Sequence, residues 1–264
     1  MNVNNKVIWV TGASSGIGEA LAYALAKRGA KLILSSRRKE ELERVKASCK
    51  GKDGDIQILP LDLGQRDSLK LTTEAAVQMF GHIDMLIHNG GISQRSLAKD
   101  TDMEVDRKLM EVNYFGTVEI TKHLLPHFLD RKTGHYIVVT SLVGKFGTPY
   151  RSGYSASKHA LHGFFDSLRA ELHRSNIKVT IICPGFIKTN VSVNALTEKG
   201  TKLNQMDDAQ ANGMPPDLFA RKMIHAIESG KKEVYIGGKE TYGVYLKRFF
   251  PSLFARVVRK ARVR

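Results

Sequence analysis

The run Thr11-Gly12-Ala13-Ser14-Ser15-Gly16-Ile17-Gly18 follows a short apolar segment, and apolar residues then recur at helical spacing as far as residue 25. Glycines allow a tight turn and let a ligand approach the backbone, while the first N–H groups of a helix attract phosphate. The run therefore predicts a strand, a glycine turn and a helix that together bind the pyrophosphate of a nucleotide. The residues expected to contact it are Gly12, Ser14, Ser15, Gly16, Ile17 and Gly18.

Seven short, largely apolar segments alternate with longer helical patterns along the chain. Such segments are typical of strands that helices cover on both faces of a parallel sheet. The 264 residues are therefore predicted to form a single α/β domain of Rossmann type, with a doubly wound, mostly parallel seven-stranded sheet and helices on both faces. The expected strands are Lys6–Val10, Lys31–Ser35, Ile56–Leu59, Met85–His88, Tyr136–Thr140, Val179–Cys183 and Glu233–Ile236, and the longest expected helices are Asp67–Phe80, Thr101–Phe128 and Ser152–Arg174.

The composition is that of an ordinary globular protein, with 42% hydrophobic and 25% charged residues. No apolar run approaches the roughly 20 residues of a membrane-spanning helix, and Val7–Val10 is too short for the core of a signal peptide. Cys49 and Cys183 have neither metal-ligand nor disulfide spacing. Free thiols in a reducing, cytoplasmic setting are therefore expected.

Two other patterns resemble functional motifs. Gly12-Ala13-Ser14-Ser15-Gly16 reads G-x-S-x-G, the nucleophile elbow of serine hydrolases, but a single predicted strand precedes it and Gly18 has no place in it. His123 and His127 have a spacing that suits a metal, but Pro126 is expected to interrupt their helix. We therefore predict a structural role for the two histidines and no metal site.

The net charge of +15 is concentrated late in the chain, because residues 239–264 hold eight Lys and Arg against one acid, Glu240. Residues 1–238 are assigned to the main domain and residues 239–264 to a basic, amphipathic tail. Two alternatives stay open for this tail: peripheral contact with an anionic membrane, or packing against the domain or a second subunit. Nucleic-acid binding is not expected, since its usual motifs are missing. The tail's apolar residues are Tyr242, Tyr245, Leu246, Phe249, Phe250, Leu253, Phe254, Val257, Val258 and Ala261, and its basic residues include Arg256, Arg259, Lys260 and Arg262.

Further motifs follow the glycine turn, whose Gly12, Gly16 and Gly18 have the spacing G-x-x-x-G-x-G. In order they are Asp62-Leu63, Asn89-Gly90-Gly91, Asn113, Ser141, Tyr154-x-x-x-Lys158, and Pro184-Gly185 with Thr189. From about Val7 to Thr189 the chain thus resembles the single-domain short-chain dehydrogenases/reductases (SDRs). The runs Ser35–Arg38, Gly90–Leu97 and Ala156–Leu161 are similar to the member-7-like branch, near the microsomal hydroxysteroid and retinal reductases.

The resemblance implies an oxidoreductase that moves a hydride between a nicotinamide and a carbonyl or secondary alcohol. Tyr154 would exchange a proton with the substrate oxygen, and Ser141 would hydrogen-bond the same atom. Lys158, on the same helix face, would favour the phenolate and hold the nicotinamide ribose, while Asn113 would hold a water between Lys158 and solvent. A homodimer or homotetramer is implied, through the helices around Asn113 and Tyr154. The cofactor residues expected beyond the glycine turn are Ser36, Arg37, Arg38, Asp62, Leu63, Asn89, Gly90, Tyr154, Lys158, Pro184, Gly185, Ile187 and Thr189.

The cofactor is expected to be NADP(H). An NAD enzyme of this fold normally has an acid near the end of its second strand, but Ser35-Ser36-Arg37-Arg38 is followed by no carboxylate before Glu40. Arg37 suits a 2′-phosphate, and an NAD-dependent dehydrogenase of the same fold stays the alternative. The expected substrate pocket mixes apolar and polar residues, which suits a moderately hydrophobic carbonyl or alcohol, and residues 186–216 would form its lid. Its segments are Ser93–Leu97, Val143–Tyr150 and Phe186–Gly213.

One motif departs from the family pattern. His88-Asn89-Gly90-Gly91 stands where Asn-Asn-Ala-Gly is usual. Because Asn89 is retained, the loop is expected to keep its role, while His88 alters the local hydrogen bonding. A catalytically silent protein of this fold, bound to membrane or nucleic acid through its basic tail, is the remaining alternative.

Overall fold

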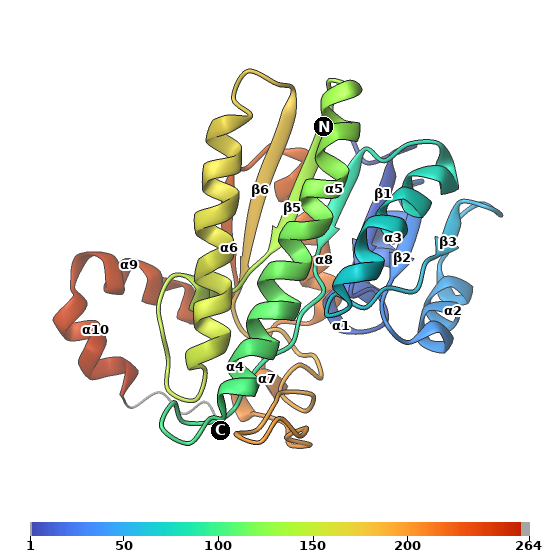
Figure 1. Cartoon of the computed structure of the whole chain (residues 1–264). Coiled ribbons are helices and arrows are strands. Elements are labelled where there is room, and N and C mark those ends of the chain that lie inside the picture. Colours follow the sequence, from blue (N-terminus) through green and yellow to red (C-terminus); the bar gives the residue numbers. More distant parts are fainter. Residues whose placement is uncertain (1, 260–264) are drawn as a thin grey trace.

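The computed structural model describes residues 2–259 and contains one seven-stranded sheet. Its strands are β1 (Val7–Thr11), β2 (Lys31–Ser35), β3 (Ile56–Ile58), β4 (Met85–His88), β5 (Gly134–Val139), β6 (Ile177–Pro184) and β7 (Glu233–Ile236). All neighbours pair in parallel, in the order β3-β2-β1-β4-β5-β6-β7 (Figure 1). The predicted fold class is therefore confirmed, and every predicted strand is present with ends shifted by at most two residues. The order reverses between β1 and β4, where the diverging loops leave a crevice for a ligand.

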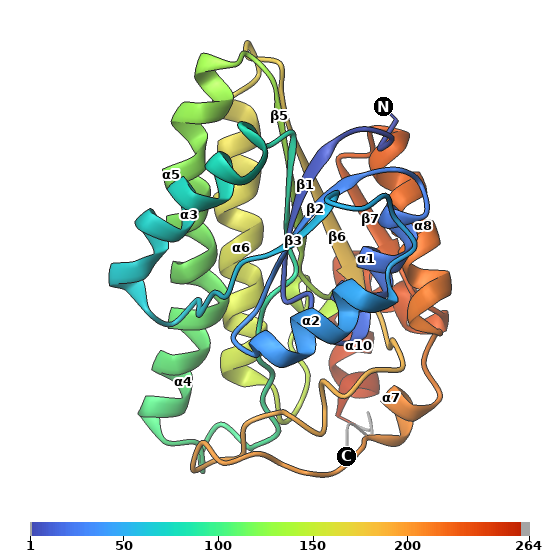
Figure 2. The ribbon, with the colours of Figure 1, turned by 90° about the vertical axis from the view of Figure 1, so that its right-hand side faces the viewer.

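Helices cover both faces of the sheet. They are α1 (Gly16–Ala26), α2 (Lys39–Ser48), α3 (Arg66–Phe80), α4 (Met103–Met110), α5 (Gly116–Asp130), α6 (Ser152–Glu171), α7 (Asp208–Ala211), α8 (Pro216–Glu228), α9 (Tyr242–Phe249) and α10 (Pro251–Val258). Figure 2 shows α3, α5 and α6 on one face and α1, α2 and α8 on the other. Successive residues of a strand point to opposite faces, so Ile8 packs in the core with α1 and α8, whereas Trp9 packs in the core with α3, α5 and α6.

The helix expected over Thr101–Phe128 is divided by a π-helical turn. α4 leads without a break into this turn, Glu111–Phe115, which leads into α5. A π-helical turn has wider spacing than an α-helix and often occurs at functional sites. Here it contains the buried Asn113.

Pro126 does not interrupt its helix, so that expectation was wrong. α5 continues through Pro126 to Asp130, because packing of α5 against α3 and the sheet sustains the helix despite one missing N–H group. His127 Nε2 accepts a hydrogen bond from the Ile83 N–H at 3.2 Å, which is a structural contact. His123 lies 3.7 Å from a carboxylate oxygen of Glu119, one turn earlier on α5.

The basic tail forms α9 and α10, which extend beyond the sheet beside α6 (Figure 1). Phe254 is buried, and its ring centroid lies 5.0 Å from that of Phe146, so one side of the tail packs on the domain. Leu253 and Val257, also on α10, are exposed. No helix within residues 2–259 is both long and apolar enough to span a membrane. The tail residues Lys260, Ala261 and Arg262 lie outside the described part of the chain.

Candidate active site

The glycine turn between β1 and α1 is held against the loop that follows β4. Gly12 has a φ of +67°, and a Cβ at this position would lie 2.7 Å from the Gly90 Cα. A side chain at Gly18 would collide with the Gly12 carbonyl oxygen. Asn89 Nδ2 donates to the carbonyl oxygens of Thr11 and Gly12, both at 3.1 Å. The turn therefore requires glycine, and it opens α1 toward a cavity.

His88, the departure from the family motif, turns away from the glycine turn. Its Nε2 shares a hydrogen bond of 2.8 Å with the Thr121 hydroxyl on α5. Burial and the charge of Lys158 lower the pKa of His88 to about 3, so the imidazole is neutral. The Asn89 N–H still donates to the Thr11 hydroxyl at 3.1 Å. The His88 side chain is thus accommodated between the sheet and α5, and the loop after β4 keeps its hydrogen bond with β1.

Two arginines at the end of β2 line the cavity beside the glycine turn. Arg38 Nη2 donates to the Ser14 hydroxyl at 3.3 Å, which fixes its guanidinium next to the turn. Arg37 and Ser36 also line the cavity there. The sequence predicts Arg37 as the residue that binds a 2′-phosphate, whereas in the structure it is Arg38 that donates a hydrogen bond to the glycine turn.

Ser141, Tyr154 and Lys158 come together at the ends of β5 and α6. Ser141 lies two residues after the end of β5, and a hydrogen bond with its side chain lowers the pKa of Tyr154. The ammonium of Lys158 lies 5.8 Å from the Tyr154 ring centroid and donates to the Val139 carbonyl at 3.0 Å. Because Tyr154 and Lys158 are one helical turn apart on α6, one face of that helix presents both.

Asn113 supports this group from behind. Its Oδ1 accepts from the Ile92 N–H at 2.8 Å, and its Nδ2 donates to the Ile92 carbonyl and the Ser157 hydroxyl, both at 3.0 Å. The π-helical turn thereby ties the loop after β4 to α6. A Cβ at Gly91 would lie 2.9 Å from the Asn113 Oδ1 and 3.6 Å from the Lys158 Nζ, so the amide, the loop and the ammonium are neighbours.

The protonation of this group is set by burial and by cations. Burial raises the pKa of Tyr154 above its usual value, while the charges of Arg151 and Arg95 and the Ser141 hydrogen bond oppose that increase. Burial lowers the pKa of Lys158 to about 8. The sequence predicted Lys158 as the cation that favours the phenolate, whereas the cations that lower the pKa of Tyr154 in the structure are Arg151 and Arg95.

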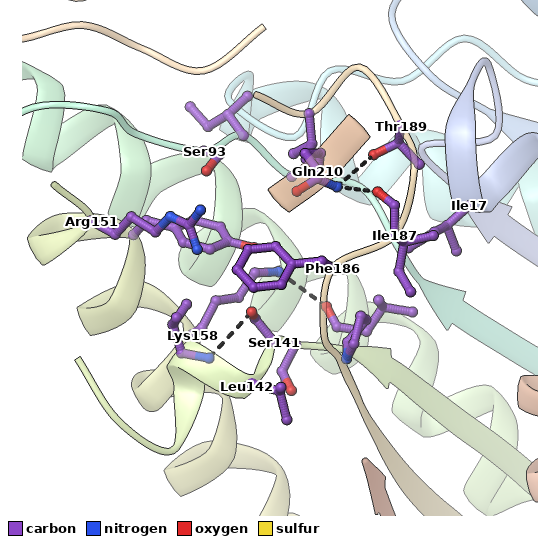
Figure 3. A pocket seen from close by; sticks show the side chains of 18 of the residues that line it. Ile17, Ser93, Ser141, Leu142, Arg151, Lys158, Phe186, Ile187, Thr189 and Gln210 are labelled. Carbon is purple, nitrogen blue, oxygen red and sulfur yellow. Dashed lines mark hydrogen bonds between the residues drawn. The ribbon is translucent and has the colours of Figure 1, made fainter. Parts of the chain in front are cut away.

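A single cavity of about 1100 Å³ runs from the glycine turn past Tyr154 to α9 and α10. Figure 3 shows Ser141, Lys158, Arg151 and Phe186 meeting there from different elements. Gly18 and Asn113 do not line it, because Gly18 closes the turn and Asn113 lies behind Ile92. The other predicted site residues all line the cavity: Gly12, Ser14, Ser15, Gly16, Ile17, Ser36, Arg37, Arg38, Asp62, Leu63, Asn89, Gly90, Ser141, Tyr154, Lys158, Pro184, Gly185, Ile187 and Thr189.

Comparison with known proteins gives the family of this chain. The sequence matches the family described as short chain dehydrogenase over residues 6–200. The chain belongs to the short-chain dehydrogenase/reductase family. Human dehydrogenase/reductase SDR family member 7 is 46% identical to this SDR over 256 residues, which cover 95% of the chain and 76% of the human protein. An SDR family protein 7-like from Anopheles gambiae is 43% identical over 265 residues, covering 98% and 84% of the two chains. The expected member-7-like branch is therefore confirmed.

Solved structures place this SDR in the same fold. A short-chain dehydrogenase from Streptomyces avermitilis superposes with a TM-score of 0.81 at 26% identity, covering 97% of this SDR and 96% of that protein. A short-chain dehydrogenase from Burkholderia cenocepacia in complex with NADP gives a TM-score of 0.80 at 26% identity, covering 98% and 99%. As a member of this family, the protein is an oxidoreductase with a nucleotide-binding Rossmann fold.

Sequence reasoning missed a buried ionic cluster in the substrate half of this SDR. The Nε of Arg95 donates to the Asp207 Oδ2 at 2.8 Å, and the Arg151 Nη2 lies 3.5 Å from the same oxygen. All three side chains are at least nine-tenths buried. Asp207 precedes α7 on the loop after β6, so the cluster ties that loop to the loop after β4 and to the start of α6.

The loop after β6 is anchored at two further points. Gln210 Nε2 donates to the Ile187 carbonyl and, at 3.4 Å, to the Thr189 hydroxyl, as Figure 3 shows. The Glu240 carboxylate accepts from the Phe186 N–H at 3.0 Å, which connects the start of the tail to the same loop. The segment expected to act as a lid thus lies across the cavity and is held at both ends.

Proposed function

We propose that this SDR is an NADP(H)-dependent oxidoreductase that interconverts a carbonyl and a secondary alcohol of moderately hydrophobic character. The observation that carries the proposal is the meeting of Ser141, Tyr154 and Lys158 on the same cavity as the glycine turn. The NADP complex of the Burkholderia cenocepacia relative supports the cofactor. When bound, the nicotinamide would supply or accept the hydride.

The residues of the cavity fit a dinucleotide. The glycine turn from Gly12 to Ile17 lines the cavity, and the free N–H groups at the start of α1 suit the charge of a pyrophosphate. Arg37 and Arg38 stand where the adenosine ribose of a Rossmann fold lies. Lys158 would hold the hydroxyls of the nicotinamide ribose.

The roles proposed for the side chains follow from their contacts. Tyr154 would pass its hydroxyl proton to the carbonyl oxygen during reduction and remove it during oxidation. Ser141, already hydrogen-bonded to Tyr154, would donate to the same substrate oxygen. Arg151 and Arg95 would stabilise the phenolate that forms. Asn113 would position Lys158 and its route to solvent.

Cofactor preference is the direct test of this proposal. The purified protein is titrated with each nucleotide and binding is followed by nicotinamide fluorescence. NADPH is expected to bind at least 10-fold more tightly than NADH. The double variant Arg37→Ala/Arg38→Ala is expected to lose about 10- to 100-fold in NADPH affinity, because each guanidinium makes charge-assisted hydrogen bonds to a 2′-phosphate. Its NADH affinity should change by less than about threefold, since NADH has no 2′-phosphate.

The matched control is Lys39→Ala, which removes the next cation along the chain without touching the cavity. Equal affinity for the two nucleotides would favour the NAD-dependent alternative, and the arginine assignment would then be wrong. If neither nucleotide binds, the oxidoreductase proposal itself fails.

The exposed side of α9 and α10 is further proposed to contact an anionic membrane surface. Tyr242, Phe249 and Phe250 are 71%, 68% and 62% exposed, and Lys247 and Arg248 lie in the last turn of α9. Exposed aromatic rings beside cations are typical of segments that lie in an anionic interface.

Vesicle sedimentation tests this surface. The protein is expected to sediment with phosphatidylserine-containing vesicles at low salt, to sediment less as salt rises, and to stay in solution with phosphatidylcholine alone. Phe249→Ser/Phe250→Ser should reduce the bound fraction at least twofold, while Leu71→Ser, at an exposed apolar residue of α3, should not. Absence of binding to the anionic vesicles at low salt would remove the proposal.

Self-association is proposed through the helices that carry Asn113 and Tyr154. Phe115, at the end of the π-helical turn, and Leu129, on α5, are 49% and 44% exposed, so this face offers apolar area to a second copy. The cytoplasmic setting expected from Cys49 and Cys183 stays a prediction; both are free thiols.

A further inference from the structure

Arg151 is a buried cation whose hydrogen-bonding capacity the protein uses only in part. Among the described residues, its Nε and Nη2 have no hydrogen-bond partner, although its side chain is 8% exposed. The nearby Asp207 Oδ2 already accepts two hydrogen bonds from Arg95 and lies 3.5 Å from the Arg151 Nη2. A buried guanidinium is normally hydrogen-bonded as well as paired, because its desolvation is costly. Arg151 therefore has donors available for a group that enters the cavity.

The backbone holds Arg151 in place at some cost. Tyr150, the preceding residue, has a φ of +65°, a region that a large side chain rarely adopts. Its carbonyl accepts from the Ser96 N–H at 3.1 Å, and Ser96 forms a β-bridge with Arg151. A strained backbone of this kind persists only where the surrounding contacts hold it. Here the contacts with Ser96 hold Tyr150, and they thereby set the position of the start of α6. Arg151 then stands three residues before Tyr154, so both side chains reach the same part of the cavity.

The surroundings of Arg151 favour an anion with an apolar body. Its guanidinium carbon lies 5.7 Å from the centroid of the Phe186 ring, and Figure 3 shows the two side chains next to each other. In the described lining beyond the cofactor residues, Glu240 is the only carboxylate, and its Oε1 accepts from the N–H groups of Phe186 and Gly238. Farther along, the lining is aromatic and aliphatic. Its members there include Phe146, Leu246, Phe254 and Val258.

We infer that Arg151 binds a carboxylate of the substrate, so that this SDR acts on apolar oxo acids and the corresponding hydroxy acids. The inference rests on the proposed function, because it places the reacting carbonyl at Tyr154 and Ser141. One guanidinium offers a carboxylate two parallel hydrogen bonds, and a single negative charge matches it; a dianion would keep an uncompensated charge beside the Phe186 ring. The apolar chain of the acid would extend toward α9 and α10.

The test compares an acid with its neutral analogue of the same shape. 2-Oxooctanoate and 2-oxooctanamide are titrated calorimetrically into the protein saturated with NADP⁺, which cannot reduce them. The acid is expected to bind about 10- to 100-fold more tightly than the amide, the range for hydrogen bonds between charged groups. In Arg151→Gln this preference should disappear through loss of acid affinity, with amide affinity changed by less than about threefold. Arg151→Lys should keep part of the preference.

The controls separate a binding role from a structural one. Lys188→Gln removes an exposed cation of the loop after β6 that does not line the cavity, and it should leave the acid preference intact. Equal affinity for acid and amide in the unaltered protein would overturn the inference. So would an equal loss for both ligands in Arg151→Gln, which would show that Arg151 only supports the fold. Tighter binding of octyl phosphate than of octanoate would exclude the carboxylate.

Failure of the proposed function would give a different result from failure of the Arg151 inference. If NADP⁺ does not bind, the cofactor assignment is wrong, and the acid and amide are then compared on the protein without nucleotide. Preference for the acid that depends on Arg151 would still support this anion site, and its absence there would overturn it.

Discussion

Tyr154→Phe is expected to lower kcat by about 10²- to 10⁴-fold, the range that general acid–base catalysis contributes. The substitution removes one hydroxyl, the group proposed to exchange a proton with the substrate oxygen. Ser141 would still hydrogen-bond that oxygen, and Lys158 would still contact the ribose, so NADPH affinity should stay within about threefold. The rate is followed as NADPH oxidation with the carbonyl compound that the unaltered protein reduces fastest.

Tyr136→Phe is the matched control for loss of a buried tyrosine hydroxyl. That hydroxyl donates to the Thr121 carbonyl at 3.0 Å, between the sheet and α5 and away from the cavity. Its removal should cost about 1–2 kcal/mol of the free energy of unfolding, because a buried carbonyl loses its partner, and should leave kcat within about twofold. A Tyr154→Phe protein that keeps more than a tenth of the rate would show that another group transfers the proton.

The fold could be predicted because its signals are local. Each buried strand is a short apolar run between polar turns, and the spacing of Gly12, Gly16 and Gly18 directly after such a run marks the β1–α1 turn. The π-helical turn could not be predicted, since one extra residue in a helix alters hydrogen bonding without altering the apolar pattern enough to show. The predicted interruption at Pro126 was wrong for a related reason: tertiary packing outweighs one missing hydrogen bond in α5.

The candidate site divides in the same way. Tyr154 and Lys158 belong to one helical turn, so their spacing alone placed them on one face. Arg95 and Asp207 are 112 positions apart, and nothing in either neighbourhood indicates that both are buried. Charged residues in loops usually face solvent, so the residue types alone predict that Arg95 and Asp207 are exposed. The effect of Arg95 and Arg151 on the pKa of Tyr154 therefore depends on how the loops fold, and the sequence alone could not predict it.

Asp207→Ala is expected to lower the free energy of unfolding by about 3–5 kcal/mol, the cost of removing one partner from a buried ion pair. The carboxylate is the group that Arg95 and Arg151 share, so its loss leaves two buried guanidinium groups facing each other. Urea denaturation at low ligand concentration measures the change. Asp208→Ala, at the exposed neighbouring position, should cost less than about 1 kcal/mol.

The order of losses within the cluster tests this explanation. Arg95→Met keeps most of the buried volume and leaves Asp207 beside Arg151, so the remaining charges still form a pair. It should therefore cost less than Asp207→Ala, which leaves like charges together. If Arg95→Met were the more damaging change, the hydrogen bonds of Arg95 to the Ser93 hydroxyl and the Gln94 carbonyl would outweigh the charge balance. The loop after β4 would then be held by those bonds, and Asp207 would serve mainly to orient Arg151.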